Sequence, residues 1–303
     1  MIFIIITAYR EERTIGKAIE TVLKQTNNKD FRIIITAPDE ETGKIAKIYE
    51  KENNRVRYIK DEGKGKPAAL NKVFNWIKNN FPIDKQKDIL ILTDGDVFIG
   101  ENALSKILEK FNDPGIGVVS GRPISLNLRV DKWGYYSHLL TDIGAHETRL
   151  KRIKEGKMIV CSGYLYAFRL GLINKIPENA LSEDALISHL IYEKGYKTGY
   201  AEEAPVYVKY PDNFKDWIKQ KRRSAGGYNQ LKYFVKEKER MRSFSKETKG
   251  VFSIFKYPKN IKEFIWTVEL IFYRLCLWLL IFKDINVKKK NLKEIWLRVE
   301  STK

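Results

Sequence analysis

Residues 1–120 alternate short runs rich in β-branched side chains with longer amphipathic stretches, and this alternation constrains the fold more than any other feature of the chain. The short runs are typical of buried strands, and the amphipathic stretches are typical of helices that cover a sheet. The expected fold class is therefore α/β, with an open, mostly parallel sheet flanked by helices. The predicted strands cover residues 2–7, 32–36, 56–59, 89–92 and 116–119.

Helical spacing appears between these strands and again after them. Thr14 stands where an N-cap is expected, just before the apolar residues Ile15, Ala18, Ile19, Val22 and Leu23. Beyond residue 121 the regular alternation ends, and a helical stretch over 131–154 precedes an apolar strand that ends at residue 169. A shorter helix follows, with Ser182 predicted to cap its start and Gly195 its end.

The positive charge of the chain is concentrated in one region. The formal net charge is +18, and residues 209–262 hold sixteen Lys and Arg against five Asp and Glu. A basic surface attracts nucleic acid, anionic lipid headgroups or phosphorylated substrates, and charge alone does not choose among these partners.

The cysteines and histidines form no catalytic or metal-binding pattern. Cys161 and Cys276 are far apart and lack a CxxC context, which favours a reducing compartment. His138, His146 and His189 do not form a cluster in the sequence, so we assign them no role. The phosphate-binding loop GxxxxGK[ST] is also missing, which argues against a P-loop enzyme.

Residues 264–282 are strongly apolar, interrupted by Glu269 and Arg274. This length would barely span a bilayer. The insertion energy of the apolar side chains, roughly −5 kcal/mol, is offset by two charges at about 3 kcal/mol each, so insertion is not compelled. On a helical projection one face is apolar and carries Phe264, Val268, Ile271, Phe272, Leu275, Leu279 and Phe282.

This amphipathic pattern, followed by Lys288, Lys289 and Lys290, predicts a helical tail that docks on an anionic membrane surface. Because Met1 leads directly into a strand-length run with no basic segment before it, the expected location is the cytoplasmic face of the membrane, peripheral or monotopic. A helix packed on the protein's own core and a true membrane span are the alternatives.

The string TDGD follows the fourth predicted strand and places Asp94 and Asp96 at its carboxyl end. Ligands bind beyond the carboxyl ends of strands in open α/β sheets, and Gly95 allows a turn that brings both carboxylates toward one point. Mn²⁺ and Mg²⁺ prefer such oxygen ligands, held together with the oxygens of a substrate diphosphate. The sequence therefore predicts a divalent metal site, although a DGD turn by itself is often only a loop.

Six motifs occur in order along the chain: AYREE, GKPAALN, TDGD, SGYLYAF, SEDA and QKRRSAGGY. Together they resemble the family 2 glycosyltransferases, which are inverting enzymes with the GT-A fold. The resemblance covers about residues 1–235, and residues 296–303 are similar to the end of membrane-associated members. It implies transfer of a sugar from a UDP- or GDP-sugar with the help of Mn²⁺ or Mg²⁺.

The resemblance also implies a donor pocket at the carboxyl edge of the sheet. AYREE is similar to the family's AYNEE stretch, with Arg10 where Asn is usual, and GKPAALN is similar to its GK-x-x-ALN element, which includes Asn71. The segment around Asp39 departs from the family's usual pair of aspartates. The implied nucleotide-sugar-binding residues are Thr7, Tyr9, Glu11, Asp39, Lys66 and Asp94.

In SEDA, Asp184 matches the family's catalytic base and Glu183 its companion carboxylate. Inversion needs a group that removes a proton from the acceptor hydroxyl as this hydroxyl attacks the anomeric carbon, and a carboxylate can do so. Acidic residues in a first helical turn also offset the helix dipole, which is a purely structural alternative.

QKRRS is similar to the QxxRW element of membrane-associated members, with Gln220 and Arg223 in register and Ser224 in place of tryptophan. This substitution weakens any case for processive polymer synthesis. Gln220, Arg222 and Arg223 are the expected contacts to the diphosphate or to an anionic acceptor, since guanidinium groups bind phosphate bidentately.

The sequence thus predicts a GT-A catalytic domain over residues 1–233 and a basic amphipathic membrane-docking tail over 234–303. The expected acceptor is a hydroxyl on a lipid-linked or membrane-proximal glycan. Transfer to a polyprenyl phosphate is the alternative within the same class, and a basic nucleic-acid-binding protein is the alternative outside it. Paired aspartates would repel nucleic-acid phosphates, so we expect no nucleic acid as a partner.

Overall fold

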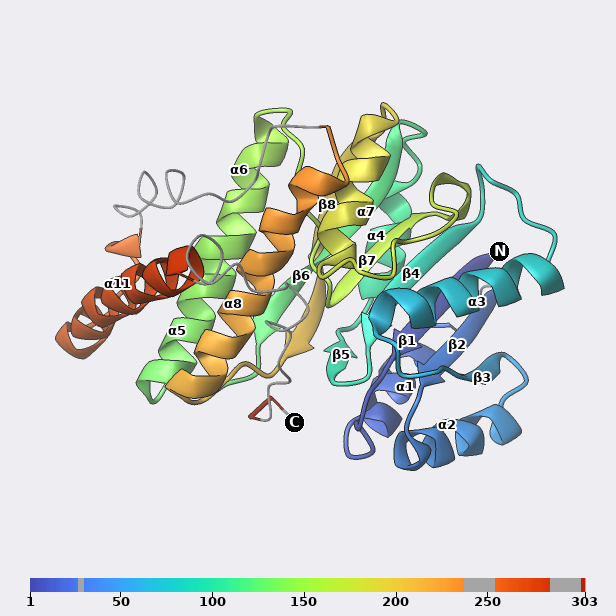
Figure 1. Ribbon diagram of the computed structural model, residues 1–303, viewed down its shortest axis with the longest axis horizontal. Helices are drawn as coiled ribbons and strands as arrows, with labels where there is room; N and C mark the ends of the chain where they lie inside the picture. Colours follow the sequence, from blue (N-terminus) through green and yellow to red (C-terminus); the bar gives the residue numbers. More distant parts are fainter. Residues whose placement is uncertain (27–29, 237–253, 284–300, 303) are drawn as a thin grey trace.

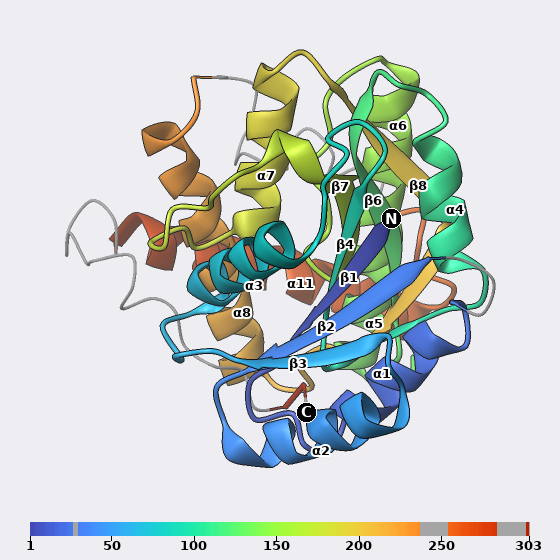
Figure 2. The ribbon, with the colours of Figure 1, turned by 90° about the vertical axis from the view of Figure 1, so that its right-hand side faces the viewer.

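The computed structural model describes residues 1–26, 30–236, 254–283 and 301–302. One eight-stranded sheet runs through the described residues in the order β3-β2-β1-β4-β7-β6-β8-β5, with helices on both faces (Figures 1 and 2). This is the α/β architecture that the sequence predicted.

All five predicted strands are present. They are β1 Ile2–Thr7, β2 Phe31–Ala37, β3 Val56–Lys60, β4 Ile89–Asp94 and β6 Ile116–Ser125. The first four pair in parallel as one block. Side chains along β1 and β2 are buried on both faces, as expected for parallel strands covered on two sides.

Three further strands complete the sheet: β5 Val97–Ile99, β7 Leu165–Arg169 and β8 Lys197–Val208. β7 runs antiparallel to both β4 and β6, so the sheet is mixed. The sequence analysis predicted β7 but missed β5 and β8. β8 contains Gly199, two adjacent glutamates and Pro205, which weaken the apolar signal of a strand.

Two hydrophobic cores lie on opposite faces of the sheet. Helices α1 Ile15–Leu23, α2 Glu40–Glu52 and α4 Ala103–Lys110 pack on one face. Helices α3 Lys66–Asn80 and α7 Glu183–Glu193 pack on the other (Figure 2). Successive residues of β1 divide between the two cores, with Ile4 and Ile6 in one and Phe3 and Ile5 in the other.

The helical stretch predicted over 131–154 is present as three joined segments. They are α5 Lys132–Thr141, the π-helical η1 Asp142–Glu147 and α6 Thr148–Lys154. Helix α8, Phe214–Gln230, packs near it, and the short 3₁₀ segments are η2 Leu170–Leu172 and η3 Leu231–Tyr233.

Two of the three predicted helix caps were wrong in their chemistry. Thr14 has helical backbone angles, and its hydroxyl donates to the Glu11 carbonyl instead of accepting from the helix. Ser182 precedes α7 but its side chain makes no capping hydrogen bond, and Gly227 of α8 packs directly against this side chain. Gly195 does follow α7 with a φ of +87°, the left-handed conformation expected at a helix end.

Helix α11, Ile261–Phe282, is the described part of the tail and lies on the left in Figure 1. Its inward side chains Leu270, Leu277 and Ile281 join a third core with aromatic residues of α5 and α8. By length and composition, α11 is the one helix among the described residues that could cross a membrane. The boundary predicted between residues 233 and 234 stays a prediction.

The side chains of α11 are oriented in an unusual way. Its acidic residues face the protein: Glu263 pairs with Arg129 at 2.7 Å and Glu269 with Lys132 at 2.7 Å. In contrast to these acidic residues, five side chains of the predicted apolar face are exposed, with exposed fractions from 47% to 71%. They are Phe264, Val268, Phe272, Leu275 and Leu279. The lysines at 288–290 and the segment 296–300 lie outside the described residues.

Candidate active site

The carboxyl ends of β1 and β4 bring the first and third motifs together. The parallel register places Thr7 beside Asp94, and the Thr7 hydroxyl donates to Asp94 Oδ1 at 2.6 Å. Lys66, the first residue of α3, donates from Nζ to the same oxygen at 2.7 Å. The side chains after these two strands therefore form one polar cluster at the edge where α/β proteins bind ligands.

Lys66 also joins this cluster to the start of α7. Its Nζ lies 2.9 Å from Glu183 Oε1, and the Glu183 side chain is only 10% exposed. Burial would lower the pKa of the Lys66 ammonium, but the charges of Asp94 and Glu183 outweigh burial and raise that pKa above its usual value. One ammonium therefore links GKPAALN, TDGD and SEDA.

Asp184 lies next to Glu183 and is partly accessible. A Cβ on Gly163, in SGYLYAF, would lie 3.1 Å from Asp184 Oδ2, so the glycine lets this loop approach the carboxylate closely. Burial, together with the charge of Glu183, raises the pKa of Asp184 to about 6, while the Ala185 N–H, Lys66 and Arg149 act in the opposite direction. A carboxylate with such a pKa is ionised at neutral pH and is a better base than an exposed one.

Helix α8 fixes the start of α7 through two residues that the sequence analysis did not assign. A Cβ on Gly227 would lie 1.9 Å from the Ser182 hydroxyl, so only glycine allows this approach. Gln230 accepts from the Leu181 N–H at 2.8 Å and donates to the Asn179 carbonyl at 2.7 Å. The two adjacent glycines that follow QKRRS were the sequence signal that could have pointed to this close contact.

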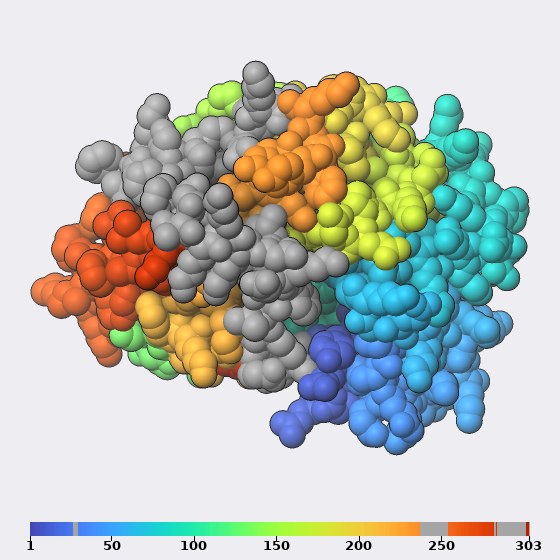
Figure 3. All heavy atoms as spheres, in the orientation of Figure 1, coloured from blue at the N-terminus to red at the C-terminus, as the bar shows by residue number. Residues whose placement is uncertain are grey.

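Asn71 has a similar supporting role. Its side chain both donates to and accepts from the backbone of Ile176, at 2.7 and 2.8 Å. This holds α3 against the segment that leads into α7, and Figure 3 shows the surfaces of α3 and the 170–182 segment meeting. Both the amide nitrogen and the amide oxygen of Asn71 are bonded to this backbone, so Asn71 supports the site by stabilising the fold around it.

Gly95 of the DGD turn is required by close packing. A Cβ there would lie 2.5 Å from Glu11 Oε2, 2.8 Å from Ala8 Cβ and 2.9 Å from the Ile15 side chain. Glu11 is buried, with 8% of its surface exposed. The AYREE stretch therefore lies directly against the DGD turn, as the resemblance implied.

Tyr164 is influenced by charges from α8 and from the DGD turn. Burial raises the pKa of its hydroxyl to about 12, Arg223 of α8 lowers this pKa, and Asp96 and Asp94 raise it. Gln220 and Arg222 lie half-buried on the same helix. The expectation that α8 supplies a cation for the diphosphate stays a prediction.

Asp39 connects the AYREE stretch, which contains Tyr9, to the start of α2. Asp39 caps α2 by accepting from the Thr42 N–H at 3.0 Å, and it also accepts from the Arg10 N–H at 2.8 Å. These bonds outweigh the effect of burial and lower the pKa of Asp39. Its contacts thus join two loops, and its role in reading a base stays a prediction, as does that of Tyr9, which is 41% exposed.

The acidic residues fit a metal ion that is shared with a substrate. The described residues contain no group of three or more His, Cys, Asp or Glu side chains that could hold an ion by themselves. Asp94 Oδ1 is already bound by Lys66 and Thr7, which leaves Asp96 and the second oxygen of Asp94. Mg²⁺ in substrate-phosphate sites typically takes one or two carboxylates, with phosphate and water oxygens as its other ligands.

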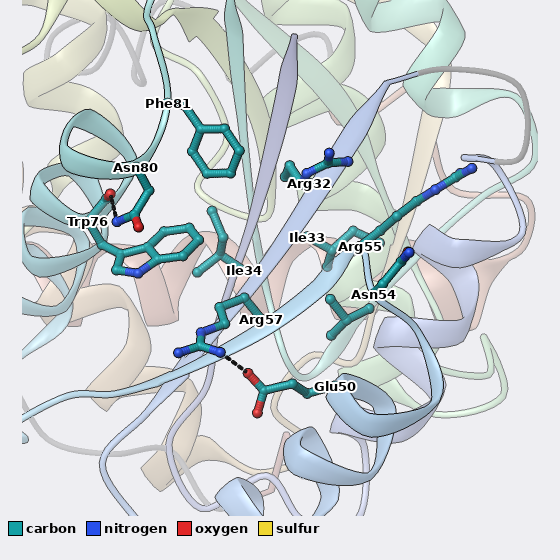
Figure 4. A pocket seen from close by; sticks show the side chains of 11 residues that line it. Arg32, Ile33, Ile34, Glu50, Asn54, Arg55, Arg57, Trp76, Asn80 and Phe81 are labelled. Atoms are coloured by element: carbon teal, nitrogen blue, oxygen red, sulfur yellow. Dashed lines mark hydrogen bonds and ion pairs between the residues drawn. The ribbon is translucent and has the colours of Figure 1, made fainter.

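A groove lies at the amino ends of β2 and β3, away from these motifs (Figure 4). This groove of about 480 Å³ is lined by Arg32, Arg55, Arg57 and Trp76, among others. Arg57 pairs with Glu50 at 3.2 Å, and Arg55 donates to a backbone carbonyl at 3.0 Å. The groove holds no pair of carboxylates, so it does not compete as the catalytic site.

Comparisons with known proteins agree with this geometry. The family model described as Glycosyl transferase family 2 matches residues 3–176. The chain is 24% identical over 245 residues to the probable glycosyltransferase YdaM of Bacillus subtilis (strain 168), covering 77% of this chain and 56% of that protein. It spans 30% to 58% of the length of the curated relatives that it matches.

Solved structures show the fold. The mannosyltransferase PcManGT from Pyrobaculum calidifontis, in complex with GDP-Man and Mn²⁺, has a TM-score of 0.58 at 15% identity, covering 97% of this chain and 82% of that one. GalNAc-T7 with UDP, GalNAc and Mn²⁺ has a TM-score of 0.52 at 16% identity, covering 91% and 57%. These likenesses confirm the GT-A fold predicted from the sequence.

Proposed function

This chain belongs to glycosyl transferase family 2, and we propose that it moves a sugar from a UDP- or GDP-sugar to an acceptor hydroxyl with inversion. The observation that carries the proposal is the Lys66 ammonium, which holds Asp94 of the DGD turn and Glu183 of SEDA together beside Asp184. Donor-side and acceptor-side carboxylates are thus placed at one edge of the sheet.

The donor side would bind the nucleotide diphosphate. Structural neighbours were solved with GDP-Man or with UDP, which supports a donor of one of these two kinds. Thr7, Glu11 and the DGD turn would line its pocket, and Arg223 would add positive charge from α8. Tyr9, Asp39, Gln220 and Arg222 stay proposed contacts at its rim.

Asp94 and Asp96 would hold Mn²⁺ or Mg²⁺ between the protein and the diphosphate. Neighbours in complex with Mn²⁺ support this choice. Such an ion supplies Lewis-acid neutralisation of the negative charge on the departing diphosphate. Lys66 would hold Asp94 in place through its ion pair, and Arg223 would offer the diphosphate a guanidinium group.

On the acceptor side, Asp184 would remove the proton from the attacking hydroxyl. Its partial accessibility lets an acceptor reach it, and its raised pKa makes it a stronger base than a solvated carboxylate. Glu183 forms an ion pair with Lys66, so its proposed role is to position the cluster beside Asp184.

We propose a lipid-linked or membrane-proximal acceptor, with α11 as the membrane contact on the cytoplasmic face. The exposed apolar face of α11 supports this location, because a helix side that packs on protein would be covered. Lys256, Lys259, Lys262 and Lys283 are exposed around its two ends, which suits anionic headgroups.

The substitution Asp184→Asn tests the reaction and separates its two acceptor classes. A sugar hydroxyl needs a base, so we expect at least about a hundredfold loss of kcat with donor affinity nearly unchanged. A polyprenyl phosphate is already ionised and would lose much less. The readout is transfer to each acceptor class, with donor affinity measured by calorimetry.

Glu193→Gln, at the other end of α7, is the matched control and should transfer normally. An Asp184→Asn variant that retains near-normal transfer to a hydroxyl acceptor would remove Asp184 from the mechanism.

A further inference from the structure

Arg149 on α6 is a buried guanidinium without a carboxylate partner. Only 4% of its surface is exposed, and no carboxylate among the described residues lies within ion-pair distance of it. Its Nε donates to the Val160 carbonyl at 3.1 Å, while its Nη1 is buried with no hydrogen-bond partner. Burying a charge in this way is costly, so its position calls for an explanation.

The segment that binds Arg149 is the one that borders Asp184. The Cys161 N–H, next to Val160, donates to the Ser188 hydroxyl at 3.0 Å, and this hydroxyl donates to the Asp184 carbonyl at 2.7 Å. Two residues further on, Gly163 lies against the Asp184 carboxylate. Arg149 therefore lies behind the loop that the proposed base packs against.

The charged groups around Asp184 come from several elements. Glu183 on α7 disfavours its ionised form, while Lys66 on α3 and Arg149 on α6 favour it. The Cys161 thiol and the Tyr166 hydroxyl are neutral at physiological pH, because burial raises the pKa of both groups. Lys66 is bound to Asp94 and Glu183, whereas Arg149 makes no ion pair with any residue that the structure describes.

We propose that Arg149 is a positioning residue for the transfer reaction, whose uncompensated charge keeps Asp184 ionised so that the carboxylate can accept the acceptor's proton at neutral pH. This inference rests on the proposed function, in which Asp184 is the base. Arg149 does not touch substrate, because it is covered by the 158–163 segment.

Arg152 provides a matched control one helical turn away. It is also buried, with 8% exposed, and its Nε donates to the Met158 carbonyl at 2.7 Å. Both arginines therefore tie α6 to the same segment. Only Arg149 is among the principal charges that act on Asp184, so a purely structural role would make the two positions equivalent.

The test is the pH dependence of kcat for sugar transfer in wild type, Arg149→Met, Arg149→Lys and Arg152→Met. Because removal of the positive charge raises the pKa of Asp184, the acidic limb of Arg149→Met should move up by about one pH unit. Its activity should fall about tenfold at pH 5 and return close to wild type at pH 9. Arg149→Lys and Arg152→Met should keep the wild-type limb.

The inference would be overturned if Arg149→Met lowered kcat by the same factor at every pH. It would also be overturned if Arg152→Met moved the acidic limb of the profile as far as Arg149→Met does. If Arg149→Met does not fold, Arg149→Gln supplies the same comparison with a smaller change of shape. Failure of the proposed function is recognised separately, because Asp184→Asn would then retain transfer, whatever the profile of the Arg149 variants.

Discussion

The carboxyl edge of β1 and β4 and the outer face of α11 depart from the usual burial pattern in opposite directions. At the sheet edge, charged groups are buried: the side chains of Lys66, Asp94 and Glu183 are between 10% and 22% exposed. On α11, large apolar side chains are exposed, up to 71% for Leu279. Soluble proteins normally bury the second kind of side chain and expose the first.

The two regions also differ in whether neighbouring groups offset the cost of burying charges or of exposing apolar side chains. The buried charges at the sheet edge neutralise one another through Lys66, so the site is held in place before any ligand binds. The apolar face of α11 has no such compensation within the described residues, while its opposite face is held to the protein by the Arg129–Glu263 and Lys132–Glu269 pairs. This difference is the basis of our proposals that the sheet edge binds a charged ligand and that α11 contacts an apolar surface.

Substitution of the DGD turn should give the largest effect. Asp96→Ala is expected to abolish transfer and Mn²⁺-dependent binding of UDP or GDP, since loss of one of few carboxylate ligands leaves diphosphate charge uncompensated. The fold should survive, because Asp96 is only half-buried. Calorimetry with and without Mn²⁺ measures this, and exposed Asp212→Ala is the control. Undiminished turnover in EDTA by wild type or variant would contradict the metal proposal.

The next largest effect tests whether the Lys66 ion pairs offset the cost of burying the carboxylates of Asp94 and Glu183. Lys66→Met leaves Asp94 and Glu183 without their shared cation, so the free energy of unfolding should fall by about 3 kcal/mol at pH 8.

Denaturant unfolding at pH 8 checks the Lys66 prediction. Lys64→Met is the control, since Lys64 pairs with Glu62 on the surface and its replacement should cost little. If the two variants lose the same free energy of unfolding, Lys66 does not hold the site together.

A smaller effect is expected when the exposed apolar face of α11 is made polar. Phe272→Ser with Leu279→Ser should reduce sedimentation with anionic vesicles severalfold, because both side chains lie on the exposed face, while donor hydrolysis stays unchanged. Leu270→Ser, which points inward with 1% exposed, should lower stability instead. Wild-type protein that ignores anionic vesicles at low salt would end the docking proposal.

The smallest effect concerns backbone strain beside the donor pocket. Arg10 has a φ of +52°, in the left-handed region that asparagine tolerates better. Arg10→Asn should therefore raise the free energy of unfolding by about 0.5 kcal/mol, measured by thermal unfolding. An equal gain from Arg10→Ala would show that the backbone conformation is not the cause.

The two regions were also unequally predictable from sequence. β1 to β4 were found because their side chains are buried on both faces, which leaves continuous apolar runs. β8 was missed because Gly199 and Pro205 interrupt its pattern, although its partners β6 and β5 accept both residues. The failed Thr14 and Ser182 caps depend on local angles and on α8, neither of which residue type encodes.

At the site, motif order predicted that Thr7, Lys66, Asp94 and Glu183 lie close together, but not which of them contact one another. The Lys66 contact with Glu183 and the Gly227 contact with Ser182 join residues far apart in the chain, so only the fold brings them together. Arg149 had no sequence signal, since a basic residue on an amphipathic helix is expected to be solvated. The apolar side of α11 followed from helical spacing, whereas the ion pairs on its other side did not.

Release of nucleoside diphosphate tests the central claim most directly. The protein is incubated with Mn²⁺ and each common nucleotide sugar in turn, and free nucleoside diphosphate is measured for wild type and for Asp96→Ala. We predict that at least one UDP- or GDP-sugar is hydrolysed slowly by wild type and not by the variant. If no nucleotide sugar yields more nucleoside diphosphate with wild type than with Asp96→Ala, the carboxyl edge of β1 and β4 is not a metal-dependent donor site.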